Sequence, residues 1–161
     1  MKPPSVRKVE DMEPAGKRWI THEGGLRFKC TQCGDCCSSE TGVVLVNRLE
    51  RERIAQRLKM SVEDFERMAT WPYDEVVRTL RTTTQGCILF DPVRRLCTVY
   101  GVHPLQCRTY PFWIGKVGTP ERWEKTCKEC PGAGTGNFYP AEQVKLMANA
   151  TTRLRELQKT K

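Results

Sequence analysis

The spacing of apolar residues predicts a series of short helices and strands in the first half of the chain. Gly42 to Val46 is a short apolar, β-branched run, which is typical of a strand. From Arg48 to Lys59 the apolar residues recur at helical spacing, with arginine and glutamate on the exposed face. Ser61 followed by Asp64 indicates the capped start of a second helix. The apolar positions of that helix repeat every three residues and are Val62, Phe65 and Met68.

The middle of the chain predicts one more short helix and a hairpin. Valine and leucine at residues 76–80 favour a third short helix. Ile88 to Phe90 and Leu96 to Tyr100 are apolar stretches on either side of a turn-forming Asp-Pro pair. That arrangement indicates a β-hairpin.

The last third of the chain predicts helical segments around a glycine-rich connection. A helical turn is expected to start at Pro104 and to end before Pro111. Three glycines within Gly132 to Gly136 favour a flexible linker. Pro140 to Lys159 carries an apolar stripe at helical spacing, with proline in the first turn, and is expected to be an amphipathic helix that packs on the core.

Together these elements predict an α+β fold with a small, cysteine-rich, metal-stabilised core. The core is expected to contain a β-hairpin and to be flanked by three or four helices. The expected organisation is a charged N-terminal arm at 1–20, a cysteine-cluster metal-binding domain at 21–138, and a C-terminal amphipathic helix at 139–161 packed on that domain. A chain of 161 residues buries roughly 68 to 70% of its unfolded surface, so its size alone does not require staples.

The cysteine content and the absence of targeting signals favour a reducing compartment. No apolar run approaches the ~18 residues that a membrane span needs, and the charged N-terminus resembles neither a signal peptide nor a transit peptide. We therefore expect a cytoplasmic location and no membrane partner. Thiols in that compartment stay free or hold metal. Nine cysteines also cannot all pair within one chain, which counts against a disulfide scaffold.

The formal net charge of +8 invites a nucleic-acid interpretation, but that count treats every cysteine as a neutral thiol. Metal ligands are thiolates. Eight thiolates would remove eight charges and two zinc ions would restore four, which leaves +4. Arginines are scattered along the chain without a single basic stripe, so nucleic acid is a less favoured partner.

The cysteines carry the strongest chemical signal. Cys30, Cys33, Cys36 and Cys37 form a C-x-x-C-x-x-C-C run, and Cys127 with Cys130 forms another C-x-x-C. A two-residue gap lets one turn bring two sulfurs onto one ion. A single C-x-x-C is weak support for a metal site, whereas three such pairs, two of which overlap, are strong support.

Adjacent Cys36 and Cys37 point in different directions in either regular backbone conformation, so they are expected to serve different sites, or one is spare. Adding the isolated cysteines and Cys130 gives eight thiols, enough for two four-thiolate sites, with Cys127 as a ninth cysteine of open use. Taken alone, each isolated cysteine could instead be a small buried apolar residue. The isolated cysteines are Cys87, Cys97 and Cys107.

The choice between zinc and iron stays open at this point. All-thiolate sites suit both zinc and iron–sulfur clusters. Bacterial ferredoxins use C-x-x-C-x-x-C followed after three residues by Cys-Pro. Here the first three cysteines match, the fourth follows at once, and the distant Cys130-Pro131 could complete such a pattern. The expected cofactor is therefore an iron–sulfur cluster of the 4Fe–4S type, or zinc.

These residues resemble the CxxCxxCC cysteine-cluster family, also called the YkgJ-like zinc- or iron-chelating domain. The resemblance covers about two thirds of the chain. It rests on Phe28-Lys29-Cys30-Thr31-Gln32-Cys33-Gly34-Asp35-Cys36-Cys37, Cys87-Ile88-Leu89-Phe90, Cys97-Thr98-Val99-Tyr100, Cys107-Arg108-Thr109-Tyr110-Pro111-Phe112 and Cys130-Pro131-Gly132.

The resemblance implies eight metal-binding cysteines. They are Cys30, Cys33, Cys36, Cys37, Cys87, Cys97, Cys107 and Cys130. Family members usually carry Arg-Pro ahead of the Cys-Arg pair, whereas this chain has His103-Pro104. Some flagellin lysine N-methylases resemble the family in their cysteine motif, but they are longer, and this chain shows no S-adenosylmethionine site.

Four residues are expected to surround the metal ligands. His103 could support or replace a ligand, and Arg108 could donate hydrogen bonds to a sulfur or offset charge. Tyr110, together with its aromatic neighbours, is expected to shield the site from water, and Tyr100 lies beside a ligand candidate.

Three functional hypotheses follow. The first is a metal-binding protein that holds zinc or an iron–sulfur cluster through these cysteines. The second is an iron–sulfur-dependent redox or group-transfer enzyme, methylase-like in its motif, or an accessory protein, with catalytic residues unassigned. The third is a zinc-ribbon-like nucleic-acid-binding module, whose affinity would fall steeply with salt.

Overall fold

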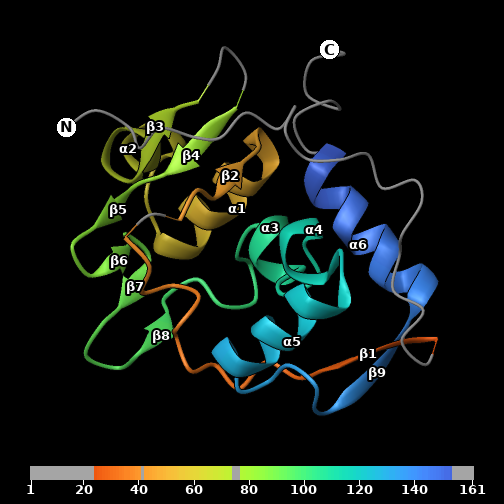
Figure 1. Cartoon of the computed structure of the whole chain (residues 1–161). Coiled ribbons are helices and arrows are strands. Elements are labelled where there is room, and N and C mark those ends of the chain that lie inside the picture. Colours follow the sequence, from red (N-terminus) through yellow and green to blue (C-terminus); the bar gives the residue numbers. More distant parts are fainter. Residues whose placement is uncertain (1–23, 41, 74–76, 154–161) are drawn as a thin grey trace. The chain divides into compact units, whose positions relative to one another are not determined.

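A computed structural model describes residues 24–40, 42–73 and 77–153, and the chain divides into two compact units. The first unit is Gly34–Arg108, and the second unit contains residues 24–33 together with residues 109–153. Figure 1 labels the helices and strands of both units. The expected N-terminal arm at 1–20 lies outside the described residues.

The first unit starts with a three-stranded antiparallel sheet and two helices. The strand order in the sheet is β2-β4-β3. The elements are β2 (Leu45–Val46), α1 (Arg48–Leu58), α2 (Val62–Ala69), β3 (Thr70–Pro72) and β4 (Arg78–Leu80).

Local side-chain hydrogen bonds determine where the two helices begin. Asn47 and Glu50 form a capping box at the start of α1, in which each side chain accepts a hydrogen bond from the other's backbone N–H at 2.9 Å. Ser61 caps α2 by accepting from the N–H of Asp64 at 3.0 Å. Both caps satisfy backbone donors that the first helical turn leaves unpaired.

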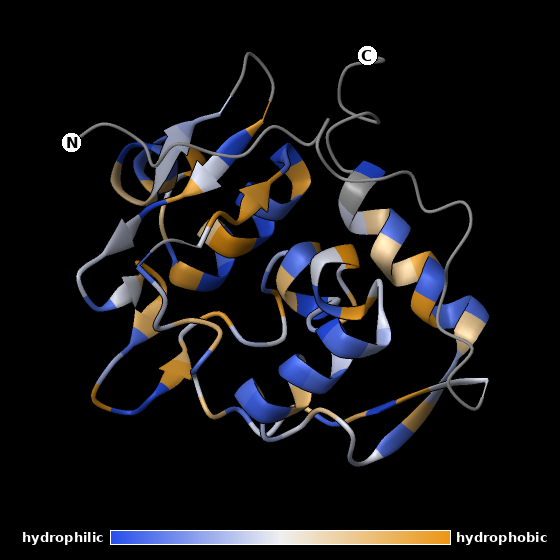
Figure 2. Cartoon of the chain, viewed as in Figure 1, coloured by the Kyte–Doolittle hydropathy of each residue, from blue (hydrophilic) through white to orange (hydrophobic). Residues whose placement is uncertain are grey.

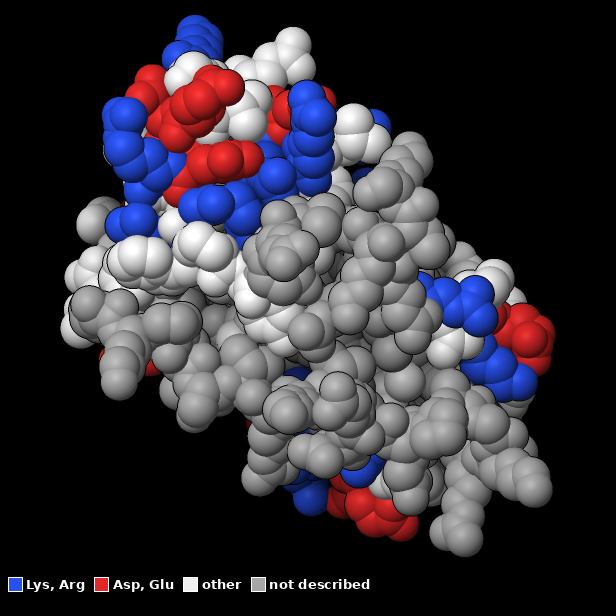
Figure 3. Space-filling view, turned by 90° about the horizontal axis from the view of Figure 1, so that it is seen from above, with Lys and Arg blue, Asp and Glu red and all other residues white. Residues whose placement is uncertain are grey.

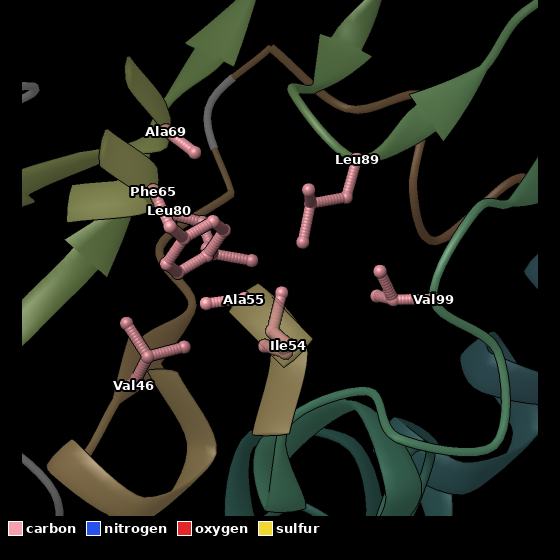
Figure 4. Packing of buried hydrophobic residues seen from close by; sticks show 8 residues of the cluster. All are labelled: Val46, Ile54, Ala55, Phe65, Ala69, Leu80, Leu89 and Val99. Carbon is pink, nitrogen blue, oxygen red and sulfur yellow. The ribbon is translucent and has the colours of Figure 1, made fainter. Parts of the chain in front are cut away.

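The apolar core of the first unit is formed by side chains from both helices, the sheet and the loops that follow. Figure 4 shows these side chains pointing toward one another, with Phe65 among them. Phe65 and Ile54 are completely buried, so this core contributes substantial apolar burial to the stability of the unit. The labelled members are Val46, Ile54, Ala55, Phe65, Ala69, Leu80, Leu89 and Val99.

Two short hairpins and one helical turn complete the first unit. The β5 strand pairs with β6, and β7 pairs with β8, both antiparallel. These elements carry three of the cysteines. Their bounds are β5 (Thr82–Thr83), β6 (Gly86–Cys87), β7 (Phe90–Asp91), β8 (Leu96–Cys97) and α3 (Leu105–Arg108).

The second unit combines a two-stranded ribbon with three helices. Figure 2 shows hydrophilic and hydrophobic residues alternating along α6, whose Val144 and Ala148 are buried. This helix contacts both strands of the ribbon. The elements are β1 (Gly25–Phe28), α4 (Ile114–Val117), α5 (Pro120–Glu129), β9 (Asn137–Pro140) and α6 (Ala141–Arg153).

The α+β fold class predicted from the sequence is confirmed, and so are the first two helices, the hairpin at β7–β8, the turn at α3 and the described part of the last helix. The third helix predicted at residues 76–80 is wrong. Residues 78–80 form β4 instead, because pairing with β2 and β3 satisfies their backbone groups from both sides. Val76 lies outside the described residues.

In the second unit, one prediction was wrong and one helix was missed. The glycine segment is not a free linker, because the carbonyl of Gly132 accepts from Lys29 at 3.1 Å and Ala133 bridges Phe28. Helix α5 was not predicted, although Thr119 caps it and Pro120 occupies its first turn. Within the described ranges, the structure contains no helix with the length and apolar character of a membrane span.

Candidate metal centre

The nine cysteines are divided between the two units, and no disulfide joins any of them. The first unit contains five cysteines, which are Cys36, Cys37, Cys87, Cys97 and Cys107. The second unit contains four, which are Cys30, Cys33, Cys127 and Cys130. The C-x-x-C-x-x-C-C run is therefore shared, with its first pair of thiols in one unit and its last pair in the other.

A tight turn positions Cys36 and Cys37. The N–H groups of Cys37 and Ser38 both donate to the carbonyl of Gly34 at 3.0 Å. Gly34 has a positive φ of 81°, and a side chain there would meet the ring of Phe90. This segment has neither helix nor strand structure.

Backbone pairing holds Cys87 and Cys97 close to this turn. The N–H of Cys87 donates to the carbonyl of Cys37 at 2.8 Å. Cys97 pairs with Phe90 across the β7–β8 hairpin. An ion pair between Arg95 and Asp35, with 2.7 Å between nitrogen and oxygen, also links the hairpin to the cysteine turn.

Helix α3 carries Cys107. Hydrogen bonds anchor the two helix residues that precede this cysteine. The N–H of Leu105 donates to Glu50 at 2.6 Å, so the buried carboxylate that caps α1 also accepts from the start of α3. The Gln106 side chain accepts from the N–H of Leu45 at 3.0 Å and donates to the carbonyl of Val43. These bonds place Cys107 by reference to the sheet and to α1.

Burial and local contacts raise the pKa of four thiols in the first unit. The hydrogen bond with Cys37, followed by burial, raises the pKa of Cys36, although the residue as a whole is exposed. Burial raises the pKa of Cys87 to about 11 and also raises the pKa of Cys97. Burial raises the pKa of Cys107 well above its usual range.

The remaining contributions to these pKa values show that the four thiols are neighbours. The pKa of Cys107 is raised further by the charges of Cys87, Cys36 and Cys97. The pKa of Cys87 is raised by Cys97 and Cys36, and that of Cys97 by Cys36. In every pair among these four thiols, the charge of one therefore affects the pKa of the other. The sulfur of Cys37 lies 3.8 Å from the sulfur of Cys36.

Backbone N–H groups two residues downstream act on two of these sulfurs. The N–H of Leu89 lowers the pKa of Cys87, and the N–H of Val99 lowers the pKa of Cys97, each through a hydrogen bond that opposes the effect of burial. Such bonds favour the thiolate, which is the form that binds metal.

The side chains are not gathered around a single point. In the segments that the structure describes, no three His, Cys, Asp or Glu residues form a group that could hold a metal ion as they stand. In both units, the thiol side chains would therefore have to reorient to bind a single ion.

Comparison with known proteins identifies the family to which this cysteine pattern belongs. The CxxCxxCC family, described as a "putative zinc- or iron-chelating domain", matches residues 29–132, which is more than half of the chain. This chain belongs to the CxxCxxCC family. The match includes all nine cysteines.

A similar protein is an uncharacterized protein of Methanocaldococcus jannaschii. It is 26% identical over 110 residues, which are 68% of this chain and 58% of the relative. The chain thus spans a little over half of the length of that relative. No solved structure matches the chain.

The donor set of this CxxCxxCC chain fits the metals that the family description names. Sulfur ligands are soft donors that suit zinc and iron–sulfur centres. Cys36, Cys87, Cys97 and Cys107 are four neighbouring thiols, which is the number of thiolates that one such centre requires.

The residues expected around the ligands occupy different places in the structure. His103 stacks on Tyr100, with 4.9 Å between ring centroids, and its Nδ1 accepts from the N–H of Gly101 at 3.1 Å. Burial, followed by the charge of Arg108, lowers the pKa of His103. Tyr110 belongs to the second unit, where it packs edge-on against Trp113.

The surface charges form local pairs. Figure 3 shows Lys and Arg interspersed with Asp and Glu on the described part of the visible face. On α1 and α2, arginines pair with nearby carboxylates, which partly neutralises the basic excess there. The pairs are Arg48–Glu52, Arg51–Glu66 and Arg67–Asp64.

Gly86 lets the segment that contains Cys87 approach the segment that contains Cys37. A Cβ at this position would collide with the carbonyl of Cys37, and its φ is +103°. We expect Gly86→Ala to cost about 1–3 kcal/mol through backbone strain alone and to reduce the metal content. Thermal unfolding and metal analysis measure the two effects.

Gly115→Ala is the matched control, because nothing lies within 4 Å of the added Cβ. We expect that variant to be as stable as the parent or slightly more stable. Equal losses of stability and metal in the two variants would show that the contact at Gly86 has no special role.

Proposed function

We propose that this protein binds an iron–sulfur cluster of the 4Fe–4S type through Cys36, Cys87, Cys97 and Cys107. The observation that carries the proposal is that these four thiols lie in one neighbourhood, where the Cys87–Cys37 backbone hydrogen bond and the Arg95–Asp35 ion pair hold the cysteine turn to both hairpins. The family description adds independent support for a zinc or iron centre.

We favour a cluster over a single ion because a cluster accepts a wider spacing of its four sulfurs. Around one zinc ion, four sulfurs bind the same atom and are in contact with one another. In a 4Fe–4S cluster each sulfur binds a different iron, so the sulfurs stand farther apart. The four thiols come from four separate segments, which are the cysteine turn, β6, β8 and α3, and a cluster can bridge such segments.

The surroundings of the thiols suit a buried, negatively charged centre. The sulfurs of Cys87 and Cys97 accept backbone N–H bonds, and both residues pack against the apolar core of the first unit. Hydrogen bonds to sulfur and exclusion of water are the main means by which a protein adjusts the reduction potential of a cluster. The cluster, when bound, would supply one-electron chemistry.

The proposal is tested by purifying the full chain without air and measuring iron, acid-labile sulfide and zinc. We expect about four irons and four sulfides per chain, with visible absorbance that bleaches on reduction. A colourless protein that contains zinc and no sulfide would overturn the cluster assignment.

The adjacent cysteines provide a sharper test, because the charge of Cys36 raises the pKa of Cys87, Cys97 and Cys107. We expect Cys36→Ser to lose most of the iron and sulfide. Cys37→Ser should retain most of both, since Cys37 contacts the sulfur of Cys36 but contributes its backbone carbonyl to Cys87. The pair is a matched control, and the reverse order of losses would assign the ligand to Cys37.

A further inference from the structure

We propose that the second unit binds a zinc ion of its own through Cys30, Cys33, Cys127 and Cys130. This site uses none of the four ligands proposed for the cluster. It includes Cys127, which is not among the eight cysteines that the family resemblance implies. Two C-x-x-C pairs are the donor set of ribbon-type structural zinc sites.

The backbone register brings the two C-x-x-C segments together. Strand β1 pairs with β9, and the pairing continues beyond β1 through the bridge between Phe28 and Ala133. The N–H of Lys29 then donates to the carbonyl of Gly132 at 3.1 Å. The two segments are antiparallel. Cys30 directly follows Lys29, the last paired residue of its segment, and Cys130 lies two residues before Gly132, the partner of Lys29.

Gly132 allows this close approach. A Cβ at Gly132 would collide with the carbonyl of Lys29, so a larger residue would separate the two cysteine segments. Gly132 is buried although it lies in a loop. The site therefore depends on this glycine for backbone contact between its two halves.

The end of α5 positions Cys127 and Cys130 on one face. Cys130 is the C-terminal cap of the helix, and its N–H donates to Thr126 at 2.8 Å. Residues three apart on a helix are neighbours on its surface. Burial, followed by the charge of Cys130, raises the pKa of Cys127, which agrees with the closeness of the two thiols.

A third contact links Cys127 to the other half of the site. The sulfur of Cys127 lies 3.3 Å from the position that a Cβ of Gly134 would occupy. The N–H of Gly134 donates to the carbonyl of Arg27 in β1, at 2.9 Å. Cys127 therefore faces the loop that is bonded to the strand leading into Cys30.

A hydrogen bond to sulfur and a left-handed residue shape the turn between Cys30 and Cys33. The N–H of Gln32 donates to the sulfur of Cys30 at 3.4 Å. Gln32 has a positive φ of 55°, which is rare for a residue with a side chain and which bends the chain between the two cysteines.

The alternative explanation is that these cysteines are small apolar residues of the core. It accounts for Cys130, which is buried beside Phe28 and Phe112. It does not account for Cys30, which is exposed. It also does not account for the sulfur hydrogen bond or for the pairing of two C-x-x-C segments by backbone contacts.

Zinc binding at this site needs no oxidant or reductant. Each thiol that is neutral releases its proton to solvent, and each resulting thiolate donates an electron pair to Zn²⁺. The apolar side of Cys130 is covered by the core cluster, while the exposed side of Cys30 leaves an entry path for the ion.

The test uses the full chain, loaded with iron and zinc, and compares Cys127→Ser with Cys107→Ser. We expect Cys127→Ser to lose about one zinc per chain while retaining its iron and sulfide. Cys107→Ser should lose iron and sulfide while retaining that zinc. In cobalt-substituted protein, the parent should show the strong absorption of tetrahedral cobalt bound to sulfur, and Cys127→Ser should lose it.

A second variant keeps the proposal testable if Cys127→Ser folds poorly. Cys127→His retains a zinc ligand, so it should restore about one zinc per chain with a cobalt spectrum shifted toward mixed nitrogen and sulfur ligation. Full zinc retention in Cys127→Ser would overturn the proposal. A parent that binds zinc here but holds no iron would contradict the proposed cluster and leave this site supported.

Discussion

Replacing Cys107 with serine, or removing the metal with a strong chelator, is expected to unfold the first unit of this protein. The four proposed ligands come from the cysteine turn, two hairpins and α3, and the described strands among these elements are only two residues long. Structural zinc sites contribute about 10–16 kcal/mol in apparent binding, and we expect a cluster held by four thiolates to couple binding to folding in the same way. Whole domains have net stabilities of about 5–15 kcal/mol, so little stability would remain.

Thermal unfolding followed by circular dichroism measures this effect in the parent, in the parent with chelator and in Cys107→Ser. The chelator should lower the melting temperature of the parent strongly and have little further effect on Cys107→Ser. An unchanged melting curve after complete removal of metal would show that the apolar core alone stabilises the unit.

Truncating Phe65 is expected to have the second largest effect. Phe65 is completely buried in the core of the first unit, among the side chains in Figure 4. Removing a buried phenylalanine side chain costs about 3–5 kcal/mol, because apolar burial is lost and a cavity remains. We expect Phe65→Ala to lose stability in this range in the metal-loaded protein, measured by chemical denaturation.

Met68→Ala is the matched control for this experiment. Met68 lies on the same helix three residues farther on, and 57% of it is exposed. Its truncation should change the free energy of unfolding by less than about 0.5 kcal/mol. Comparable losses of stability in both variants would mean that α2 does not bury the face that contains Phe65.

The contrast between Phe65 and Met68 shows how far periodicity alone can lead. The sequence placed both residues on the apolar side of α2 because they are three positions apart. In the structure only Phe65 reaches the core, while Met68 is exposed, and Leu49 of α1 is likewise 63% exposed. Residue spacing defines a face of a helix, but the width that is covered depends on which elements pack against it.

The metal centre shows the same division. The C-x-x-C motifs indicated a thiol-rich chelating domain, which the family match supports, because a short turn between two thiols is a local property. The motifs left Cys127 unassigned and did not determine how the cysteines are grouped. Sequence distance misleads here, since Cys30 and Cys36 are six residues apart yet lie in different compact units.

Residue patterns in the chain predicted the α+β class, the first two helices, the capped start of α2, the hairpin after Cys87 and a thiol-rich chelating domain. Most of these depend on residues close together in the chain. The strand at residues 78–80 and the pairing of Gly132 with Lys29 emerged only from the folded structure. Those outcomes depend on backbone hydrogen bonds between distant segments, and no local pattern specifies which segment the chain will bring alongside.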